Sequence, residues 1–457
     1  MQLRKLAVIA AALAVILTAA GVRQASASDL ALRRSLELFS PLDAVRGRAT
    51  GWFLQEAGKD TIPALILALR FAQKNEREIE TALEKLAGER VSGGWFGWML
   101  WQQAHPEITP FEGFDRLHAA VMTNIDPNFA MFLYSGVRHD IRLEEITWGG
   151  VVKDGIPALT NPKQVAAGDA QYLGNDDLVF GVSINGDARA YPLRIMDWHE
   201  MFNDVVGGVP VSLAYCTLCG SGILFDTAVE GREKPFVFGS SGFLYRSNKL
   251  MYDEATHSLW NQFIGKPVVG PLTVSGIELK TRPVVITTWA DWRQRNPSTT
   301  VLALDTGFNR NYSTGAAYGT YFSNNEMMFP ALVDQTKLKS KDYVFALRSS
   351  GAEKAWPLSL FESDPVINDV AGALDLTLCG DAKTRSVRAY RTNGEKFARG
   401  PSPDTLMLDG KEWQVTEDAL LGPSGETMRR LPGHVAYWFA WSGYLGGKGA
   451  LASSPGK

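Results

Sequence analysis

Cysteine is nearly absent from this chain. Only 3 of its 457 residues are Cys, which excludes the framework of several disulfides that holds small secreted proteins together. Two of the three stand close together in Cys216-Thr217-Leu218-Cys219-Gly220. Two thiols at this spacing can form a small disulfide, exchange electrons with a substrate or supply two ligands to one metal ion.

The chain also lacks a basic stripe and the signatures of several enzyme classes. Its formal net charge is −3, and Lys and Arg are not clustered, so nucleic acid is not expected as a partner. It contains no G-x-S-x-G elbow, no Gly-rich phosphate loop with Lys and no H-E-x-x-H motif. These absences leave the Cys pair as the strongest candidate for chemistry.

Long apolar runs are confined to the N-terminus. Arg4 and Lys5 precede an apolar stretch that ends at Ala20, and Ala25-Ser26-Ala27 follows it. This order predicts a secretory signal peptide over residues 1–27. The apolar stretch is short for a membrane span of ~20 residues, so we expect cleavage after Ala27 and no stable membrane span afterwards. The mature protein is expected to be periplasmic or secreted, where disulfides persist.

The pattern of apolar residues changes near residue 140 and predicts an α+β protein. Apolar positions recur at helical spacing before this point, most clearly in residues 60–91, where Asp60-Thr61 can cap a helix before Pro63. After it, short strand-like runs are broken by Gly, Pro, Asn and Asp, with one helix expected from Leu193 to Asp204. We therefore predict three parts after the signal peptide: a small α-helical domain at 28–140, a main β-rich domain at 141–330 and a second β-rich unit at 331–457. Residues 305–330 are expected to form a long connecting loop.

Two segments of the β-rich part resemble each other. Residues 179–213 align with residues 344–378 at a constant offset of 165, and 11 of the 35 positions are identical. A weaker echo pairs Trp260 with Trp413 and Gly270-Pro271 with Gly422-Pro423. We interpret this self-similarity as an internal duplication, in which the second copy is degenerate.

The duplication separates residues that build the fold from candidates for chemistry. Gly186 and Gly351 are shared and are expected in hairpin turns, and the shared Asn-Asp pairs at 203–204 and 368–369 are expected to be structural. Cys379 aligns with Ala214 and is expected to be a buried free cysteine. The residues that only the first copy contains are Trp198, His199, Glu200, Cys216 and Cys219.

Three functions are compatible with this set. In a thiol redox site, Cys216 attacks, Cys219 is its partner and His199 is the base or orienting group. The usual thioredoxin-like motif opens a helix, whereas strand-like ILFD follows here. Another of the three functions is a plain structural disulfide in a binding module whose Trp and Tyr side chains line a groove.

The remaining function is a metal site. The motif resembles one knuckle of a zinc ribbon, so Cys216, Cys219 and His199 are its candidate ligands, with His257 as a further one. Two thiolates with His and the nearby Met251 would suit copper or zinc. No second Cys-x-x-Cys is present to complete such a site.

Three longer stretches resemble the domain of unknown function 3179 family of exported bacterial proteins. They are EEITWGGVVKDGIPAL, NGDARAYPLRIMDWHEMFNDVVGGVPVSLAYCTLCGSGILFD and FGSSGFLYRSNKLMYDEATHSLWNQFIGKPVVGP. The resemblance covers about Glu144 to Pro330. It implies export, and because some members are thought to carry selenocysteine at the Cys-x-x-Cys motif, it favours redox chemistry.

The family pattern also marks further residues. Ser241, Tyr245, Asn248 and Asp253 are implied to form a polar wall near the site, and Trp260 and Gln262 to bind substrate with them. His257 falls at an open position of the pattern, which weakens its role as a ligand. The other marked positions are Trp198, His199, Glu200, Asn203, Asp204, Cys216, Cys219, Gly220, Gly242, Met251 and Tyr252. The expected function is that of an exported redox-active protein, whose partner is a small molecule or a protein thiol.

Overall fold

The computed structural model describes residues 26–452, with the exception of 73, 350 and 446–449. The predicted signal peptide therefore lies outside the described residues, apart from Ser26 and Ala27. The chain has the α+β composition expected from its sequence, and it divides into two compact units. The first comprises residues 1–89 and 109–117, and the second comprises residues 90–108 and 118–457. This division does not coincide with the change of periodicity near residue 140.

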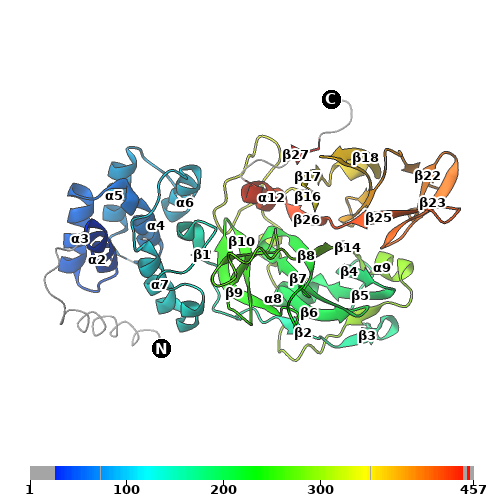
Figure 1. Ribbon diagram of the computed structural model, residues 1–457, viewed down its shortest axis with the longest axis horizontal. Helices are drawn as coiled ribbons and strands as arrows, with labels where there is room; N and C mark the ends of the chain where they lie inside the picture. Colours follow the sequence, from blue (N-terminus) through cyan, green and yellow to red (C-terminus); the bar gives the residue numbers. More distant parts are fainter. Residues whose placement is uncertain (1–25, 73, 350, 446–449, 453–457) are drawn as a thin grey trace. The chain divides into compact units, whose positions relative to one another are not determined.

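The first unit is built of helices, shown in blue in Figure 1. Helix α2 contacts α3 and α4, and α5 contacts α3 and α4. Thr61 stands at the N-cap of α4 with Pro63 in the first turn, as the sequence predicts. The Thr61 hydroxyl, however, donates to the Gly58 carbonyl at 2.7 Å instead of capping the helix. The helices of this unit are α2 (Ala27–Glu37), α3 (Asp43–Gln55), η1 (Lys59–Thr61), α4 (Ile62–Phe71) and α5 (Glu76–Ala87).

The second unit begins with helical segments and continues as β-sheets. Its helical segments are α6 (Gly94–Ala104), the end of α7 (Phe114–Ile125), η2 (Pro127–Met131) and η3 (Leu143–Glu145). No helix in the described part of the chain has the length and apolarity that a membrane crossing requires.

Three five-stranded sheets contain the first copy of the repeat. The first sheet has the order β1 (Ile146–Trp148), β9 (Phe238–Tyr245), β10 (Asn248–Asp253), β11 (Leu259–Asn261) and β12 (Lys266–Val269). The second has the order β13 (Thr281–Arg282), β8 (Ser221–Asp226), β7 (Val209–Cys216), β6 (Met201–Val206) and β2 (Leu159–Thr160). The third has the order β14 (Val285–Thr288), β4 (Leu178–Ile184), β5 (Asp187–Pro192), β15 (Thr300–Leu302) and β3 (Gln164–Ala166).

Two sheets contain the second copy. The smaller has the order β26 (His434–Tyr437), β16 (Tyr343–Ser349), β17 (Ala352–Pro357) and β27 (Ala450–Leu451). The larger has the order β18 (Val366–Ala371), β19 (Leu374–Asp381), β20 (Ser386–Arg391), β25 (Thr427–Leu431), β24 (Ala419–Leu421), β23 (Lys411–Val415), β22 (Thr405–Leu408) and β21 (Ala398–Arg399). The short helices of this region are α8 (Leu193–His199), α9 (Trp289–Arg295), α10 (Gly319–Phe322), α11 (Leu360–Ser363) and α12 (Trp438–Leu445).

The predicted duplication is present in the structure. Strands β4, β5, β6 and β7 have the same bounds as β16, β17, β18 and β19 when 165 is added to each residue number. The registers also agree, because Val179 faces Pro192 in the first hairpin and Val344 faces Pro357 in the second. Gly186 and Gly351 occupy the left-handed region in their turns, with φ of 81° and 79°.

The duplication extends beyond the segment visible in the sequence. Strand β14 pairs antiparallel with β4, leads into α9 and is followed by β15, which runs parallel to β5. Strands β26 and β27 and helix α12 repeat this arrangement around β16 and β17. Pro283, Trp289 and Trp292 then correspond to Pro432, Trp438 and Trp441 at an offset of 149. The change of offset hid this match from an ungapped comparison.

The two copies contact each other reciprocally. Strand β14 of the first copy contacts β20 of the second, and β26 of the second copy contacts β8 of the first. Because β14 corresponds to β26 and β8 to β20, equivalent surfaces face each other, as in the interface of a two-fold symmetric dimer. Figure 1 shows β14 and β26 next to each other where the two copies meet.

The shared Asn residues hold the same contact in each copy, which confirms their structural role. The Asn203 amide donates to the Phe238 carbonyl and accepts from its N–H, both at 2.9 Å. The Asn368 amide makes the same two bonds to Phe397 at 2.8 Å.

The echo between Trp260 and Trp413 belongs to this duplicated feature. Trp260 meets the ring of Phe238 edge-on at 5.2 Å and 85°, and Trp413 meets Phe397 at 5.2 Å and 84°. The two Trp residues therefore serve equivalent parts of the core.

The shared Asp residues are also structural. Asp204 accepts from the Tyr191 hydroxyl at 2.6 Å, and Asp369 accepts from the Trp356 indole at 2.7 Å. In each case the donor lies at the same position of the second strand of the copy.

Two predicted elements need correction. The helix expected from Leu193 to Asp204 ends at His199, because Glu200 adopts a left-handed conformation with φ of 54°. Residues 201–204 continue as the start of β6. The connection expected at 305–330 is mostly irregular, as predicted, but it contains helix α10.

Candidate functional site

The Cys pair forms the turn of a β-hairpin. Cys216 is the last residue of β7, and Cys219 ends the short helix η5 (Thr217–Cys219) that leads into β8. The two sulfurs form a disulfide with a Cα–Cα distance of 5.2 Å. The strand after the motif is present as predicted. Cys216 is 3% exposed and Cys219 is fully buried, so a reacting partner needs access to the Cys216 side of the turn.

The second copy forms the same turn without cysteines. Cys216 pairs with Ser221 across the first turn, and Asp381 pairs with Ser386 across the second. Gly220 and Arg385 have nearly the same φ, 59° and 58°. In the second copy the Asp381 carboxylate accepts from the Lys383 N–H at 2.8 Å. The hairpin geometry therefore does not require a disulfide.

His199 lies at the end of α8 and is fully buried. Its Nδ1 is 2.8 Å from the Pro157 carbonyl oxygen, which can only accept, so Nδ1 carries the proton. Its Nε2 is 2.6 Å from the Tyr312 hydroxyl, which donates to it. Burial lowers the pKa of His199, so the ring is neutral at pH 7. Among the described residues, the hydrogen bonds of this ring go to Pro157 and Tyr312 and not to a sulfur, which separates His199 from the role of a base that bonds a thiol.

A buried ion pair contacts the disulfide turn. The Thr217 hydroxyl, inside the Cys-x-x-Cys motif, donates to Glu200 at 2.6 Å, and Lys249 lies 2.8 Å from the other oxygen of the same carboxylate. Glu200 is 8% exposed and Lys249 is 4% exposed. In the second copy Pro365 stands at the position of Glu200, so this charge pair is specific to the copy with the cysteines.

A second carboxyl group lies next to the motif. The Tyr215 hydroxyl, one residue before Cys216, donates to Asp197 at 3.1 Å. Burial raises the pKa of Asp197 to about 7, and the negative charge of Glu200 acts in the same direction. Asp197 can therefore give or take a proton near neutral pH.

Tyrosines from the loop before the second copy cover this region. Tyr312 donates to His199, Tyr318 lies 3.4 Å from Glu200, and Tyr321 donates to the Leu218 carbonyl within the motif at 2.7 Å. This loop therefore closes over residues that belong only to the first copy.

The second copy contributes the other wall. A Cβ atom at Gly220 would lie 3.1 Å from the Tyr343 ring and 3.2 Å from the Tyr437 ring, so only glycine fits here without displacing them. The two hydroxyls are 3.0 Å apart, with Tyr343 donating to Tyr437. Both cysteines share one apolar cluster with Trp438, Phe439 and Trp441 of α12.

Of the residues implied by family resemblance, Gln262 supports the turn directly and Asn248 lies next to a residue that contacts it. The Gln262 amide donates to the carbonyls of Ala214 and Ser221 at 2.7 and 2.9 Å, and so holds both strands of the hairpin. Asn248 donates to the carbonyls of Arg246 and Ala440. The residue between Arg246 and Asn248 is Ser247, whose carbonyl oxygen is 3.2 Å from the Cys219 sulfur.

The other four residues bond within the neighbouring sheet. Ser241 donates to the Leu250 carbonyl, and Asp253 accepts from the Trp260 indole at 2.9 Å. Tyr245 ends β9, and burial raises its pKa further above the usual range, with Glu145 acting in the same direction. The structure thus brings Gln262 and Asn248 to the turn, whereas Ser241, Tyr245, Asp253 and Trp260 are held in contacts of the sheet β1-β9-β10-β11-β12.

The geometry bears on the metal hypothesis. The two sulfurs bond each other, and both ring nitrogens of His199 already have partners. Within the residues that the structure describes, no group of three or more His, Cys, Asp or Glu side chains is arranged to hold a metal ion. Met251 is buried in the apolar cluster of the cysteines, and His257 lies in the turn after β10 near the Tyr252 ring.

Comparison with known proteins agrees with the resemblance seen in the sequence. The model of the family described as "Protein of unknown function (DUF3179)" matches residues 153–447. The chain belongs to this DUF3179 family. The match covers both copies of the duplication, so it extends beyond the segment that ended near Pro330. No curated protein and no solved structure matches the chain.

The structure of this DUF3179 chain adds site residues that sequence reasoning did not single out. Asp197, Tyr215, Thr217 and Lys249 all touch the motif or its buried charges. A sequence signal exists for Lys249, because this charged residue directly precedes the apolar run of the strand NKLMYD. Tyr343 and Tyr437 could not be found this way, because their contact with Gly220 depends on the packing of the two copies.

The corresponding region of the second copy is hollow. A cavity of about 390 Å³ is lined by Asp381, Thr384 and Ser386 of the equivalent turn, and by Asp291 and Arg295 of α9. Cys379 also lines it and is free, but it is half-buried and not fully buried as expected. In this DUF3179 chain the two copies therefore differ at this position, with a disulfide in one turn and a cavity beside the other.

Proposed function

We propose that this protein is a thiol–disulfide oxidoreductase and that the Cys216–Cys219 pair is its redox group. The observation that carries the proposal is the turn at 381–386, which has the same pairing and the same left-handed residue without a disulfide. A bond that the fold does not need is available for chemistry.

The small size of the ring that the disulfide closes also supports a redox role. In the chain-entropy model, a disulfide that closes a loop of about four residues stabilises the fold by only about 2 kcal/mol. Stapling alone is therefore a weak reason to place the two cysteines of this turn in an otherwise cysteine-poor chain.

The reaction balances as a two-electron exchange with an external dithiol. A thiolate of the partner attacks Cys216, the Cys216–Cys219 bond breaks, and Cys219 leaves as a thiolate. The partner's second thiol then displaces Cys216 from the mixed disulfide. The partner is oxidised to a disulfide, this chain is reduced to a dithiol, and two protons pass from the partner's thiols to the two new ones.

Three features of the site suit this exchange. Asp197, with a pKa of about 7, can relay a proton near Tyr215 and Cys216. The Ser247 carbonyl oxygen is placed to accept a hydrogen bond from the Cys219 thiol once it forms. The Glu200–Lys249 pair holds Thr217 between the two cysteines.

The proposal is tested by titrating the purified protein in buffers of defined ratio of reduced to oxidised dithiothreitol. Alkylation followed by mass spectrometry measures the fraction of reduced Cys216 and Cys219, and circular dichroism measures the fold in the same samples. We expect reversible reduction with an unchanged fold. Cys216→Ser and Cys219→Ser should abolish exchange with a dithiol peptide and leave the protein folded.

The matched control is Cys379→Ser, which removes the free cysteine and should leave the exchange unchanged. Unfolding upon reduction, or of both single variants at the Cys pair, would identify the bond as a structural staple and overturn the proposal. That result would favour the non-catalytic binding module.

The metal-binding alternative with copper or zinc is less well supported. It requires the reduced cysteines and a third ligand, and His199 would have to give up its bond to Tyr312 or to Pro157. Metal analysis of the reduced protein, beside its Cys216→Ser variant, separates the two proposals. We place the activity outside the cytoplasm, in the periplasm or secreted, on the basis of the N-terminal sequence and the disulfide-permissive conditions of export.

A further inference from the structure

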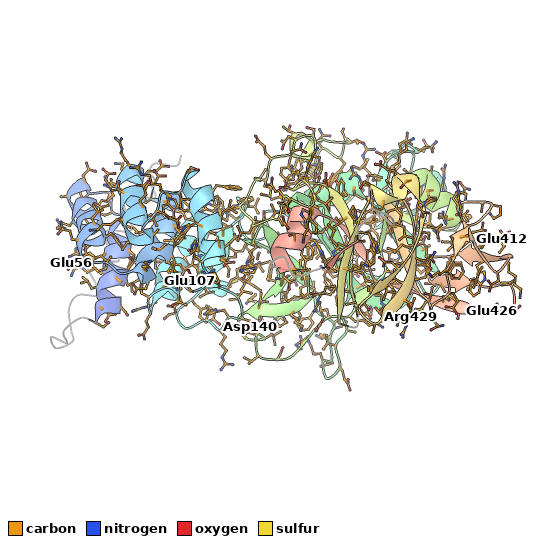
Figure 2. The ribbon with its side chains drawn as sticks, turned by 90° about the horizontal axis from the view of Figure 1, so that it is seen from above. Glu56, Glu107, Asp140, Glu412, Glu426 and Arg429 are labelled. Carbon is orange, nitrogen blue, oxygen red and sulfur yellow. A yellow bond between two sulfur atoms is a disulfide. The ribbon has the colours of Figure 1, made fainter. Side chains whose placement is uncertain are left out.

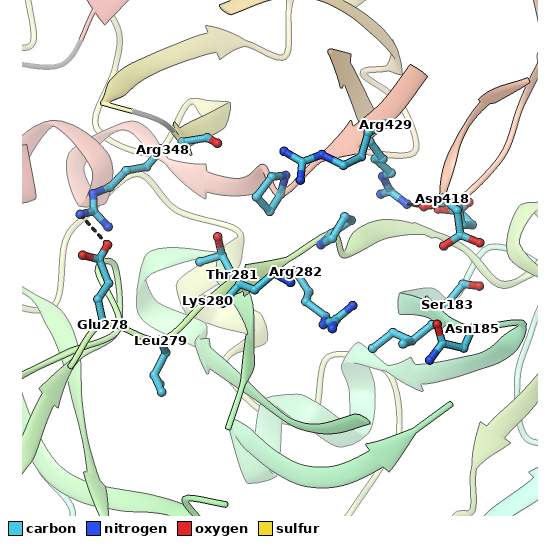
Figure 3. A pocket seen from close by; sticks show the side chains of 16 residues that line it. Ser183, Asn185, Glu278, Leu279, Lys280, Thr281, Arg282, Arg348, Asp418 and Arg429 are labelled. Atoms are coloured by element: carbon cyan, nitrogen blue, oxygen red, sulfur yellow. Dashed lines mark hydrogen bonds and ion pairs between the residues drawn. The ribbon is translucent and has the colours of Figure 1, made fainter. Parts of the chain in front are cut away.

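A cavity of about 580 Å³ lies between the two copies and away from the Cys pair. Small-molecule sites in proteins commonly have volumes of about 300–1,000 Å³. Figure 3 shows side chains that enter it from both copies, with Lys280 and Arg282 on one side and Arg348 and Arg429 on the other.

Equivalent positions of the two copies line this cavity. Ser183 at the end of β4 corresponds to Arg348 near the end of β16, and Pro283 corresponds to Pro432. The cavity therefore lies where the approximate two-fold relation brings like segments together. Interfaces between domains are a frequent place for ligand sites.

The lining carries an excess of positive charge. Lys280, Arg282, Arg348, Arg429 and Arg430 are its basic residues, and Glu278, Glu417 and Asp418 are its acidic ones. Two of these acids are each shared between two bases. Glu278 contacts Lys266 and Arg348, and Glu417 contacts Arg388 and Arg430.

Two arginines have unused donors. Arg430 is 5% exposed, and its Nε is buried without a hydrogen-bond partner among the described residues. Arg429, on the neighbouring position of β25 (Figure 2), makes no side-chain hydrogen bond or ion pair with any residue that the structure describes. The buried Nε of Arg430 is closed to the cavity, whereas Arg429 is exposed and offers its guanidinium N–H donors to an anion there.

Lys280 reinforces this arrangement from the first copy. It corresponds to Arg429 at the offset of 149, and its ammonium group is 3.8 Å from Asp226, a long contact in which the Lys280 side chain remains 70% exposed. Two equivalent basic residues therefore face one space from the two copies.

We propose that this cavity binds a small anionic molecule through a carboxylate or phosphate group held by Arg429 and Lys280. The planar fork of arginine matches both groups, because each offers two oxygens to two parallel N–H donors. This site is distinct from the disulfide turn and needs no change in the state of the cysteines.

Calorimetric titration of the full mature protein with citrate and, separately, with inorganic phosphate tests the proposal. Ionic strength is held constant with sodium chloride so that general screening does not mimic binding. We expect saturable binding of at least one of the two anions. Arg429→Gln should weaken it about tenfold or more, because a charged hydrogen-bond donor is lost, and Lys280→Gln should weaken it in the same direction.

The matched control is Arg391→Gln, which removes an exposed arginine on β20 outside the cavity and should leave the affinity unchanged. Binding of citrate alone would assign the site to carboxylates, and binding of phosphate alone to phosphates. Absence of saturable binding for both anions, or equal affinity in Arg429→Gln, would overturn the proposal. The Cys216→Ser protein should bind as the wild type does, so this test is independent of the proposed redox function.

Discussion

Asp197 is a residue whose protonation should be visible in the stability of the whole chain. Its pKa is raised from 3.8 to about 7 by burial. Below the unfolded value both states hold the proton, whereas between about pH 4 and pH 7 only the folded state holds it. The contribution of Asp197 to the free energy of unfolding therefore falls as the pH rises through this range, and it is constant above it.

Asp197→Asn should remove this dependence. The variant should gain stability relative to the wild type between pH 4 and pH 8, by on the order of a few kcal/mol. Urea denaturation at several pH values measures the difference. A difference that does not change with pH would show that Asp197 titrates normally in the folded protein.

The Glu200–Lys249 pair should be more sensitive than the ion pairs on the surface. Lys249→Met leaves a buried carboxylate without its cation, so we expect a loss on the order of 3 kcal/mol in the free energy of unfolding. Adding Glu200→Gln should restore much of the loss. Lys266→Met is the control, because its pair with Glu278 is nearly half exposed and should cost at most about 1 kcal/mol. Equal losses in both variants would contradict the burial of the first pair.

The sequence singles out the centre of the candidate site but not its surroundings. Cys216 and Cys219 stood out because the second copy lacks them, and Glu200 stood out for the same reason. The sequence places His199 in the same group, yet its ring bonds Pro157 and Tyr312. A sequence shows that a residue is absent from one copy, but it does not show in which direction the side chain points.

At the scale of the elements, the two hydrogen bonds that an Asn side chain makes to a Phe backbone in each copy, which we call the Asn clamp, can be compared for their effect on stability. Asn203→Ala removes two hydrogen bonds to Phe238 at a buried position and should destabilise the protein by about 1–3 kcal/mol. Asn368→Ala removes the same two bonds to Phe397, but Asn368 is exposed, so water can replace the amide and the loss should be smaller. Urea denaturation of the two variants gives both values. A larger loss for Asn368→Ala would show that burial does not set the strength of the clamp.

Much of the architecture can be predicted from the patterns of apolar and turn residues along the chain. What the sequence does not predict has a physical reason in each case. The repeat at 179–213 and 344–378 was visible because its hairpins tolerate no insertion between Val179 and Leu213. The match of Trp289 with Trp438 is hidden, because the segment between β8 and β14 and the segment between β20 and β26 differ in length. The helix from Leu193 was extended too far, because nothing in the sequence indicated that Glu200 would adopt a positive φ.

For the molecule as a whole, the second copy should be required for the first to fold. The apolar side chains of β26 and α12 cover the disulfide turn, and β14 packs against β20. A chain of residues 28–332 would expose these surfaces to water. We expect it to aggregate or to pair with itself. Size-exclusion chromatography and circular dichroism test this expectation, and a stable folded monomer would contradict it.

The reciprocal contact of the two copies also bears on how such a protein can change over time. If two identical chains made this interface, every substitution would appear at both related positions, and a cysteine pair in one turn would be matched by a pair in the other. Joining the halves in one chain removes that constraint. One half is then free to keep two sulfurs in a closed turn while the other opens a cavity at the related place.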